Sequence, residues 1–229
     1  MSLPLFYVAD LSQNSIVLNE DTSKHVIGVL RMSAGETITL TDGKGKKTTA
    51  IIEDDNRKKC RVSISSIQVQ EISSFNSTIG ISLIKNTARF EWFLEKATEI
   101  GIRRIIPLLC ERTEKQKFRL DRMQTILTSA MIQSQQSWLP ELNEPVTFSE
   151  ALQQENQYKF IAHCMEAEKS PLPRTSSGSS VILIGPEGDF TPKEIQSALD
   201  HQFKPVSLGH NRLRTETAGV VAAVLLSFG

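Results

Sequence analysis

Two loops near the end of the chain carry residue types that suit the binding of a small ligand. Each loop follows a short apolar run and contains glycine, with Gly185 and Gly188 in the first loop and Gly209 in the second. Glycine lets the backbone approach a ligand closely or adopt positive φ angles. Any one of these glycines alone is most simply explained as a turn residue. Three of them at two expected strand ends favour a binding site, because charged residues surround them: Glu187, Asp189, Arg212, Arg214 and Glu216.

The segments around both loops predict alternating strands and helices. The β-branched run 181–184 is typical of a strand buried on both faces of a parallel sheet, and residues 205–208 predict the next strand. Residues 191–194, Thr-Pro-Lys-Glu, predict a helix start, with an N-cap hydroxyl, a proline in the first turn and a glutamate three residues after the cap. A nearly all-apolar helix is expected from residue 215 to about 226. Ligands of such sheets bind beyond the carboxyl ends of the strands, so both loops should face one site.

Several common binding motifs are absent from the sequence. It contains no G-x-x-x-x-G-K-[ST] pattern and no G-x-G-x-x-G after a predicted strand, so a pyrophosphate cradle is not supported. The three cysteines and four histidines show no metal-ligand spacing, and therefore neither a metal site nor a disulfide framework is expected.

The residues of both loops resemble the signature of a known family. The runs that carry the resemblance are Ile184-Gly185-Pro186-Glu187-Gly188-Asp189-Phe190, Leu208-Gly209 and Leu213-Arg214-Thr215-Glu216-Thr217-Ala218. They are similar to the pattern of the ribosomal RNA small subunit methyltransferase E family, RsmE. Residues 25–31, 42–45, 96–101 and 130–140 also resemble that family, so the resemblance covers nearly the whole chain. The chain departs from the family pattern at Asn211-Arg212, where an Arg-Ile pair is usual, and at Gln136, where arginine is common.

The resemblance implies a fold, an activity and a cofactor. The family belongs to the SPOUT class of S-adenosylmethionine enzymes, so the C-terminal part is expected to form a trefoil-knotted α/β domain with a parallel sheet. The implied reaction is methyl transfer from S-adenosyl-L-methionine to N3 of a uridine in 16S ribosomal RNA of the small subunit. The cofactor is expected to contact mainly the backbone of the two loops, at Ile184, Gly185, Pro186, Glu187, Gly188, Leu208, Gly209, Leu213, Thr215 and Ala218.

Charged residues beside the loops are the candidates for the chemistry of that reaction. The uridine must be held in line with the methyl donor, and N3 must lose its proton. A cation near the uracil oxygens favours the deprotonated base, and Arg214 is the first candidate for that role, with Arg212 second. Glu216 has three open roles: a hydrogen bond to a substrate or ribose, a proton acceptor, or a first-turn acid favoured by the helix dipole. Glu187 and Asp189 could likewise either contact a ligand or cap the following helix.

The charge distribution bears on an RNA partner. The 26 basic and 26 acidic residues give a formal net charge of zero, which by itself is poor support for nucleic-acid binding. Basic residues nevertheless cluster at 44–47 and 57–61 and outnumber acids between 85 and 122, although each cluster could equally be a solvated surface. The residues expected to bind RNA are Arg31, Lys46, Lys47, Lys58, Lys59 and Arg89.

The first part of the chain is expected to form a domain of its own. Short runs of β-branched residues predict strands at 5–9, 15–18, 36–41, 47–52 and 60–69, with a hairpin around 42–45 and one helix at 22–30. Such a set of strands suggests a small β-barrel, PUA-like or OB-like, of a kind that often binds RNA. A Ser-rich break at 71–77 sets the expected domains at 1–72 and 73–229.

Strands alternate with longer helices in the expected second domain, which favours a parallel sheet. The additional strands are predicted at 78–84, 102–109 and 158–163, and the additional helices at 89–100 and 120–137. Residues 170–180 have the composition of a mobile loop.

Location and assembly are also expectations from the sequence. The chain shows neither a secretory leader nor a run long enough to span a bilayer, so a cytoplasmic protein with no membrane partner is expected. Residues 218–226 are apolar on every side and must be buried either in their own domain or against a partner, and the resemblance favours a homodimer. The alternative function is a non-catalytic RNA-binding protein that keeps the methyltransferase fold, although retention of both glycine loops argues against it.

Overall fold

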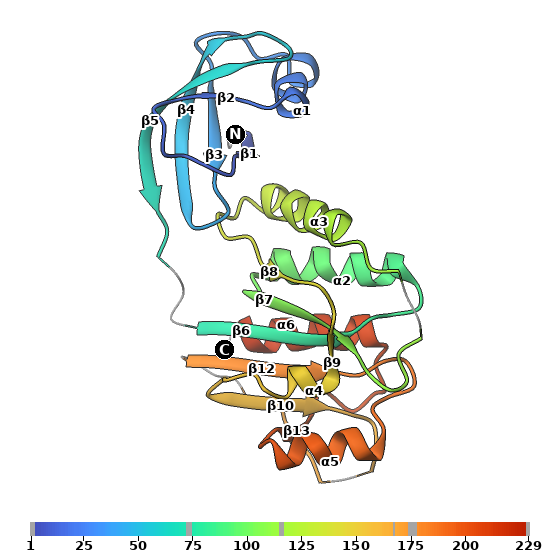
Figure 1. The fold of residues 1–229 in the computed structure, drawn as a ribbon. Helices are drawn as coiled ribbons and strands as arrows, with labels where there is room; N and C mark the ends of the chain where they lie inside the picture. Colours follow the sequence, from blue (N-terminus) through green and yellow to red (C-terminus); the bar gives the residue numbers. More distant parts are fainter. Residues whose placement is uncertain (1–2, 72–74, 115–116, 167, 174–177, 228–229) are drawn as a thin grey trace. The chain divides into compact units, whose positions relative to one another are not determined.

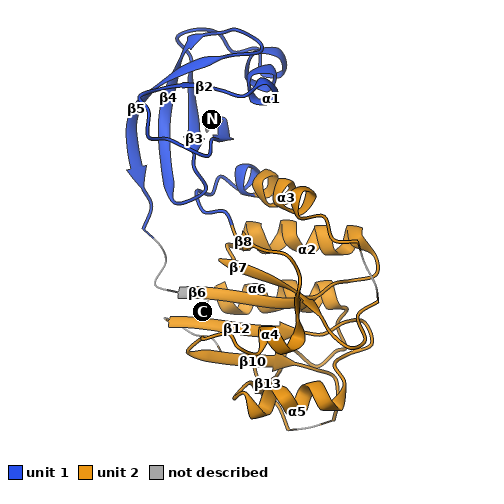
Figure 2. Ribbon diagram, in the orientation of Figure 1, with its two compact units in different colours: residues 1–72, 131–139 blue, residues 73–130, 140–229 orange. Residues whose placement is uncertain are grey.

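The computed structural model describes residues 3–71, 75–114, 117–166, 168–173 and 178–227 (Figure 1). The chain divides into two compact units, which Figure 2 shows in different colours. One unit comprises Met1–Ile72 and Met131–Leu139, and the other comprises Ser73–Ala130 and Pro140–Gly229.

The first unit is built on a five-stranded sheet in the order β1-β3-β4-β5-β2. The strands are β1 (Leu5–Tyr7), β2 (Ser15–Val17), β3 (Thr37–Thr41), β4 (Lys46–Asp54) and β5 (Arg61–Val69). β1 runs parallel to β3, and the other neighbours pair antiparallel. The inward-facing side chains, such as Leu40, Ile52 and Val62, form an apolar core. The predicted hairpin is confirmed, since the carboxylate of Asp42 accepts hydrogen bonds from the backbone N–H groups of Lys44 and Lys46 between β3 and β4.

Residues 131–139 join the first unit through that hairpin. The backbone N–H of Leu139 donates to the carbonyl of Gly43, and the N–H of Gly45 donates to the carbonyl of Ser137, both at 2.8 Å. The indole of Trp138 lies where a side chain at residue 45 would sit, so the hairpin accepts only glycine there. Hydrogen bonds and packing therefore tie this distant stretch of the chain to the sheet.

The single predicted helix of the first unit begins earlier than expected and changes type. The helix α1 (Glu20–Ser23) begins at Glu20 because Asn19 caps it, its side chain accepting from the N–H of Thr22. It continues directly into a π-helix, η1 (Lys24–Val29). Periodicity could not reveal the wider turn of a π-helix, which has i→i+5 hydrogen bonds. Arg31 follows with a positive φ of 57°, a backbone conformation that is rare for residues other than glycine.

The second unit contains an eight-stranded parallel sheet. Its order is β11-β13-β10-β12-β6-β7-β8, and β9 also pairs with β7. The strands are β6 (Phe75–Ser82), β7 (Arg104–Leu109), β8 (Glu141–Leu142), β9 (Val146–Thr147), β10 (Tyr158–Ala162), β11 (Ser170–Pro171), β12 (Gly178–Ile184) and β13 (Lys204–Ser207). The predicted parallel sheet is thus confirmed. The trefoil knot that the resemblance implies stays a prediction.

Two segments that were predicted to be irregular contain strand residues. The expected mobile loop 170–180 contains β11 at its start and the first residues of β12 at its end, while residues 174–177 of that loop lie outside the described residues. The expected break at 71–77 ends in β6, which begins at Phe75, and residues 72–74 lie outside the described residues. Sheet pairing explains the difference, because Gly178 and Phe75 are partners in the ladder between β12 and β6.

The helices that lie wholly or mainly in the second unit are α2 (Thr87–Ile100), α3 (Leu120–Gln133), α4 (Phe148–Ala151), α5 (Pro192–Asp200) and α6 (Thr215–Ser227). The last residues of α3, 131–133, belong to the first unit. The predicted start of α5 is confirmed, since Thr191 and Glu194 form a reciprocal capping box. The predicted stop of α2 is also confirmed, with Gly101 in the left-handed conformation. α3 ends at Gln133 and not at residue 137.

The last helix, α6, buries one side only. That side packs on α2 and on β6, where Gly219 lies against the rings and methyls of Phe93 and Ile81. The opposite side carries Val220, Val224 and other apolar residues that are only partly covered, and Val224 is 41% exposed. Within the part of the chain that the structure describes, no helix is long and apolar enough to cross a membrane.

Candidate functional site

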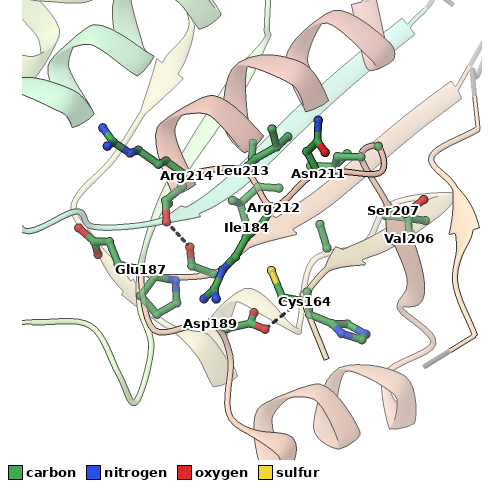
Figure 3. A pocket seen from close by; sticks show the side chains of 18 of the residues that line it. Cys164, Ile184, Glu187, Asp189, Val206, Ser207, Asn211, Arg212, Leu213 and Arg214 are labelled. Atoms are coloured by element: carbon green, nitrogen blue, oxygen red, sulfur yellow. Dashed lines mark hydrogen bonds between the residues drawn. The ribbon is translucent and has the colours of Figure 1, made fainter. Parts of the chain in front are cut away.

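A cavity of about 740 Å³ opens at the carboxyl ends of three neighbouring strands of the second unit, β12, β10 and β13. β10 lies between the other two, and its last residue, Ala162, pairs with Ile184 of β12 and with Val206 of β13. All three residues line the cavity. The two glycine loops follow β12 and β13, so the sheet order brings both to one place, as their position after the strands predicts (Figure 3).

The first loop, residues 185–190, is fixed by its own hydrogen bonds. A Cβ at Gly185 would lie 3.1 Å from the ring of Phe190, a contact tight enough that Phe190 would have to shift. The backbone N–H of Asp189 donates to the carbonyl of Pro186 at 2.9 Å. The carboxylate of Asp189 accepts from the N–H of Phe190 at 2.9 Å and from the N–H of Cys164 at 2.8 Å. Asp189 therefore ties the loop after β12 to the end of β10.

Two further segments hold the first loop from outside. The carboxylate of Glu187 accepts a 3.1 Å hydrogen bond from the backbone N–H of Lys85, just before α2. The guanidinium of Arg112 donates to the carbonyl of Gly188 at 2.7 Å, from the loop after β7. Gly188 is the one member of the predicted cofactor-binding set that is not among the residues lining the cavity. Its carbonyl is occupied by Arg112.

The second loop, residues 208–214, supplies an open wall of backbone. Gly209 has a φ of 139°, which side chains rarely tolerate, and nothing lies within 4 Å of the position its Cβ would take. Leu208, Gly209, Leu213, Thr215 and Ala218 all line the cavity. The hydroxyl of Thr215 donates a buried 3.0 Å hydrogen bond to the carbonyl of Gly185, so it joins the two loops to each other.

The three predicted catalytic residues are placed differently. Arg212 and Arg214 line the cavity and are exposed. In Figure 3 they extend in different directions from the second loop, Arg212 towards Asp189 and Arg214 away from it. Glu216 is buried in the first turn of α6 and is not among the lining residues. Its Oε1 lies 3.7 Å from Nε of Arg89, a lining residue that was predicted to bind RNA.

The other residues that were predicted to bind RNA lie in the first unit, and none of them lines the cavity. The side chains of Arg31, Lys46, Lys58 and Lys59 are exposed. Lys47 is half-buried, and its Nζ donates to the carbonyl of Gln135 at 3.2 Å, so part of its role is to hold the turn after α3.

The end of β10 adds residues outside the predicted cofactor, catalytic and RNA-binding sets, although His163 was expected near the pocket because it follows the apolar run 158–162. His163, Cys164 and Lys169 line the cavity, and Nζ of Lys169 donates to the carbonyls of His163 and Met165. Nδ1 of His163 is buried without a hydrogen-bond partner among the described residues. Burial, together with the Lys169 ammonium, lowers the pKa of His163, and the nearby carboxylate of Asp189 opposes that shift.

The lining groups suit a small organic ligand and not a metal. Among the described residues, no group of three or more His, Cys, Asp or Glu side chains could hold a metal ion. Backbone groups of two loops, one buried imidazole and a few cations surround a cavity whose volume is in the range of small-molecule sites, roughly 300–1,000 Å³. Such a site can read the edges of a heterocyclic ring with main-chain donors and acceptors.

Comparisons with known proteins match both units. A family model described as an RNA methyltransferase domain matches residues 71–227, and one described as an RNA methyltransferase PUA domain matches residues 18–65. A solved structure, a ribosomal RNA small subunit methyltransferase E from Neisseria gonorrhoeae bound to S-adenosyl methionine, is 32% identical to this chain. The TM-score is 0.87, and the match covers 97% of this chain and 95% of that chain.

Two curated relatives carry the same description. The ribosomal RNA small subunit methyltransferase E of Synechocystis sp. is 32% identical over 203 residues, a match that covers 85% of this chain and 66% of the relative. The corresponding protein of Rickettsia conorii is 28% identical over 219 residues, covering 93% of this chain and 89% of the relative.

Proposed function

This chain belongs to the ribosomal RNA small subunit methyltransferase E family, and we propose that it transfers a methyl group from S-adenosyl-L-methionine to N3 of a uridine in 16S ribosomal RNA. The observation that carries the proposal is the cavity at the ends of β12, β10 and β13. Two glycine loops line this cavity with backbone groups, and arginine side chains also line it. Open parallel sheets bind their ligands at this position.

The cavity fits the cofactor in volume and in chemistry. The open space beside Gly209 is a cradle that a side chain would fill, as expected where a ligand approaches the backbone closely. Residues 184–187 and 208–213 would hold the cofactor mainly through backbone groups, and Thr215 would keep the two loops together. When bound, S-adenosyl-L-methionine supplies a methyl group already activated by its sulfonium.

The chain itself must hold the uridine and favour loss of its N3 proton. Arg214 and Arg212 are the candidates, because a guanidinium near the uracil oxygens stabilises the charge that develops as the proton leaves. Among the described residues, neither side chain makes an ion pair that would occupy it. Arg214 remains the first candidate and Arg212 the second.

The reaction is tested by incubating the purified protein with labelled S-adenosyl-L-methionine and unmethylated small ribosomal subunits, followed by mapping of the labelled nucleoside. We expect a single N3-methyluridine. A Gly209→Val variant, strained by its φ and filling the cradle, should lose both cofactor binding and transfer. Label at another atom would overturn the N3 assignment. RNA binding by a wild-type protein that transfers no label would instead favour the alternative, a non-catalytic RNA-binding protein.

We further infer that the first unit contributes RNA affinity. Lys46, Lys58 and Lys59 are exposed there, and each contact to a phosphate releases counterions. Replacing these three and Lys47 by glutamine should weaken binding of 16S ribosomal RNA and flatten its dependence on salt, while calorimetry shows an unchanged affinity for the cofactor. An unchanged salt dependence would mean that the lysines are ordinary surface residues.

The active form is proposed to be a homodimer. The side of α6 that faces away from α2 and β6 is apolar and only partly covered, which suits pairing with the same face of a second copy. In such a dimer Arg214, at the start of α6, could serve a uridine approached from the partner. Light scattering should then give twice the 25.5 kDa chain mass, and Val224→Glu should reduce dimerisation and activity together. A fully active monomer would contradict this assembly.

A further inference from the structure

Arg89 and Glu216 join the first turns of two helices beside the cavity. Arg89 lies near the start of α2, Glu216 is the second residue of α6, and these helices pack on each other. The Arg89 side chain is 41% exposed and lines the cavity, whereas the Glu216 side chain is 8% exposed and does not. The pair therefore links a buried carboxylate to a cation at the cavity wall.

We propose that Arg89 forms a phosphate-binding subsite for the RNA strand that enters the cavity, and that Glu216 is the positioning residue that holds its guanidinium there. This inference rests on the proposed function, because it assigns the part of the RNA that this site contacts. It also resolves the three roles left open for Glu216 by the sequence: the carboxylate acts through Arg89 and does not touch the substrate.

The placement of Glu216 supports a positioning role. A buried carboxylate is costly unless partners compensate it. The free N–H groups and the dipole at the start of α6 compensate part of that cost. Among the described residues, Oε2 of Glu216 has no hydrogen-bond partner, and its nearest cation is Arg89, 3.7 Å from Oε1. The carboxylate thus restricts where the guanidinium of Arg89 can lie.

The state of Arg89 points to an anionic ligand. Within the described part of the chain, its guanidinium makes this one long ion pair and no side-chain hydrogen bond, so its forked donors remain available. A planar fork of this kind matches the oxygens of a phosphodiester. The cofactor carries a carboxylate, which such a fork also matches, but no phosphate, whereas every nucleotide of the RNA carries one. Cofactor affinity of an Arg89 variant therefore separates the two ligands. An anchored guanidinium also loses less freedom on binding than one that is free in solution, which favours affinity.

The test measures binding of unmethylated 16S ribosomal RNA over a range of KCl concentrations, alongside calorimetry with S-adenosyl-L-methionine. For Arg89→Gln we expect RNA affinity to fall roughly ten-fold. The slope of log affinity against log salt should decrease by roughly 0.7–0.9, the value of one phosphate contact. Cofactor affinity should stay within about two-fold. Arg89→Lys should keep most of the salt slope, because it keeps the charge.

Glu216→Gln should weaken RNA binding less than Arg89→Gln, and the double variant should bind RNA like Arg89→Gln alone, because one residue acts through the other. The matched control is Arg122→Gln, which breaks an Arg–Glu pair between α3 and Glu91 of α2 outside the cavity lining. Equal losses in Arg122→Gln and Arg89→Gln, or an unchanged salt slope in Arg89→Gln, would overturn the phosphate subsite. Additive losses in the double variant would overturn the positioning role.

Failure of this inference is distinguishable from failure of the proposed function. Methyl transfer by the wild-type protein tests the reaction, whereas the salt slope of the variants tests the contact without any turnover. A wild-type protein that methylates N3 while Arg89→Gln keeps the full slope would refute the subsite alone. If the wild-type protein binds RNA but transfers no methyl group, while Arg89→Gln shows the expected decrease in salt slope, the proposed reaction is refuted and the subsite is supported.

Discussion

Replacement of Thr215 by valine is expected to loosen the two loops of the cavity from each other. The Thr215 hydroxyl donates a buried 3.0 Å hydrogen bond to the carbonyl of Gly185, and this bond joins the loop after β12 to the start of α6. Valine keeps the β-branched shape and removes only the donor. The variant therefore isolates one hydrogen bond.

The expected magnitude follows from the burial of both partners. Thr215 is 5% exposed and Gly185 is buried, so the carbonyl that loses its donor cannot be fully compensated by water. Leaving a buried acceptor unsatisfied costs about 1–3 kcal/mol. For a chain of this size each kcal/mol lowers the melting temperature by about 2–4 °C, so the variant should melt about 2–12 °C below the wild type. Cofactor affinity should fall as well, because both loops line the cavity.

The assay is thermal unfolding followed by fluorescence, with calorimetric titration of S-adenosyl-L-methionine. Thr217→Val is the matched control, since Thr217 is a half-buried residue of the same helix and no hydrogen bond of its side chain is found among the described residues. Its melting temperature and cofactor affinity should stay near those of the wild type. Equal melting temperatures of Thr215→Val and the wild type, or equal losses in both variants, would refute the reasoning.

Two further predictions concern stability. In Gly219→Ala the added methyl would lie 2.6 Å from the ring of the buried Phe93, and this overpacking should lower the free energy of unfolding by about 1–3 kcal/mol. The better helix propensity of alanine should offset about 1 kcal/mol of that loss. Urea unfolding measures the net change. His163→Gln should flatten the dependence of stability on pH. Burial lowers the pKa of His163, so the folded protein favours the neutral imidazole. The wild type should therefore be most stable above the unfolded-state pKa of about 6.5, and it should lose stability as the pH falls below that value. Equal pH profiles of wild type and variant would contradict this account.

The elements that could be predicted from the sequence are those with local signals. The capping box at Thr191 and the glycine stop of α2 at Gly101 each depend on neighbouring residues alone. The two-residue strands β8, β9 and β11 are too short to show any periodicity, and their strand geometry comes from pairing with β7 and β13. The helix at η1 was predicted, but its π type was not, because its apolar pattern is that of an ordinary short helix.

The candidate site was predictable where it depends on strand ends that carry glycine. Gly185 and Gly209 follow apolar runs, and the rule for parallel sheets brings them together. His163 and Cys164 also follow an apolar run, yet nothing in their own sequence tells that β10 lies between β12 and β13. Strand order results from how the connecting helices cross the sheet, which is a property of the whole domain. Cys164 and Lys169 were therefore not predicted, and His163 was expected only near the site, without a role.

The charged residues of the two loops differ in whether their side chains already have hydrogen-bond or ion-pair partners. The carboxylates of Glu187 and Asp189 accept hydrogen bonds from backbone N–H groups and so fix the shape of the first loop. Arg212 and Arg214, by contrast, are exposed at the cavity and have no ion-pair partner among the described residues. The two acids thus accept hydrogen bonds from the backbone, while the two cations remain open to a ligand. A chain with a formal net charge of zero can in this way present a locally cationic site, which is the electrostatic condition that binding to an RNA strand requires.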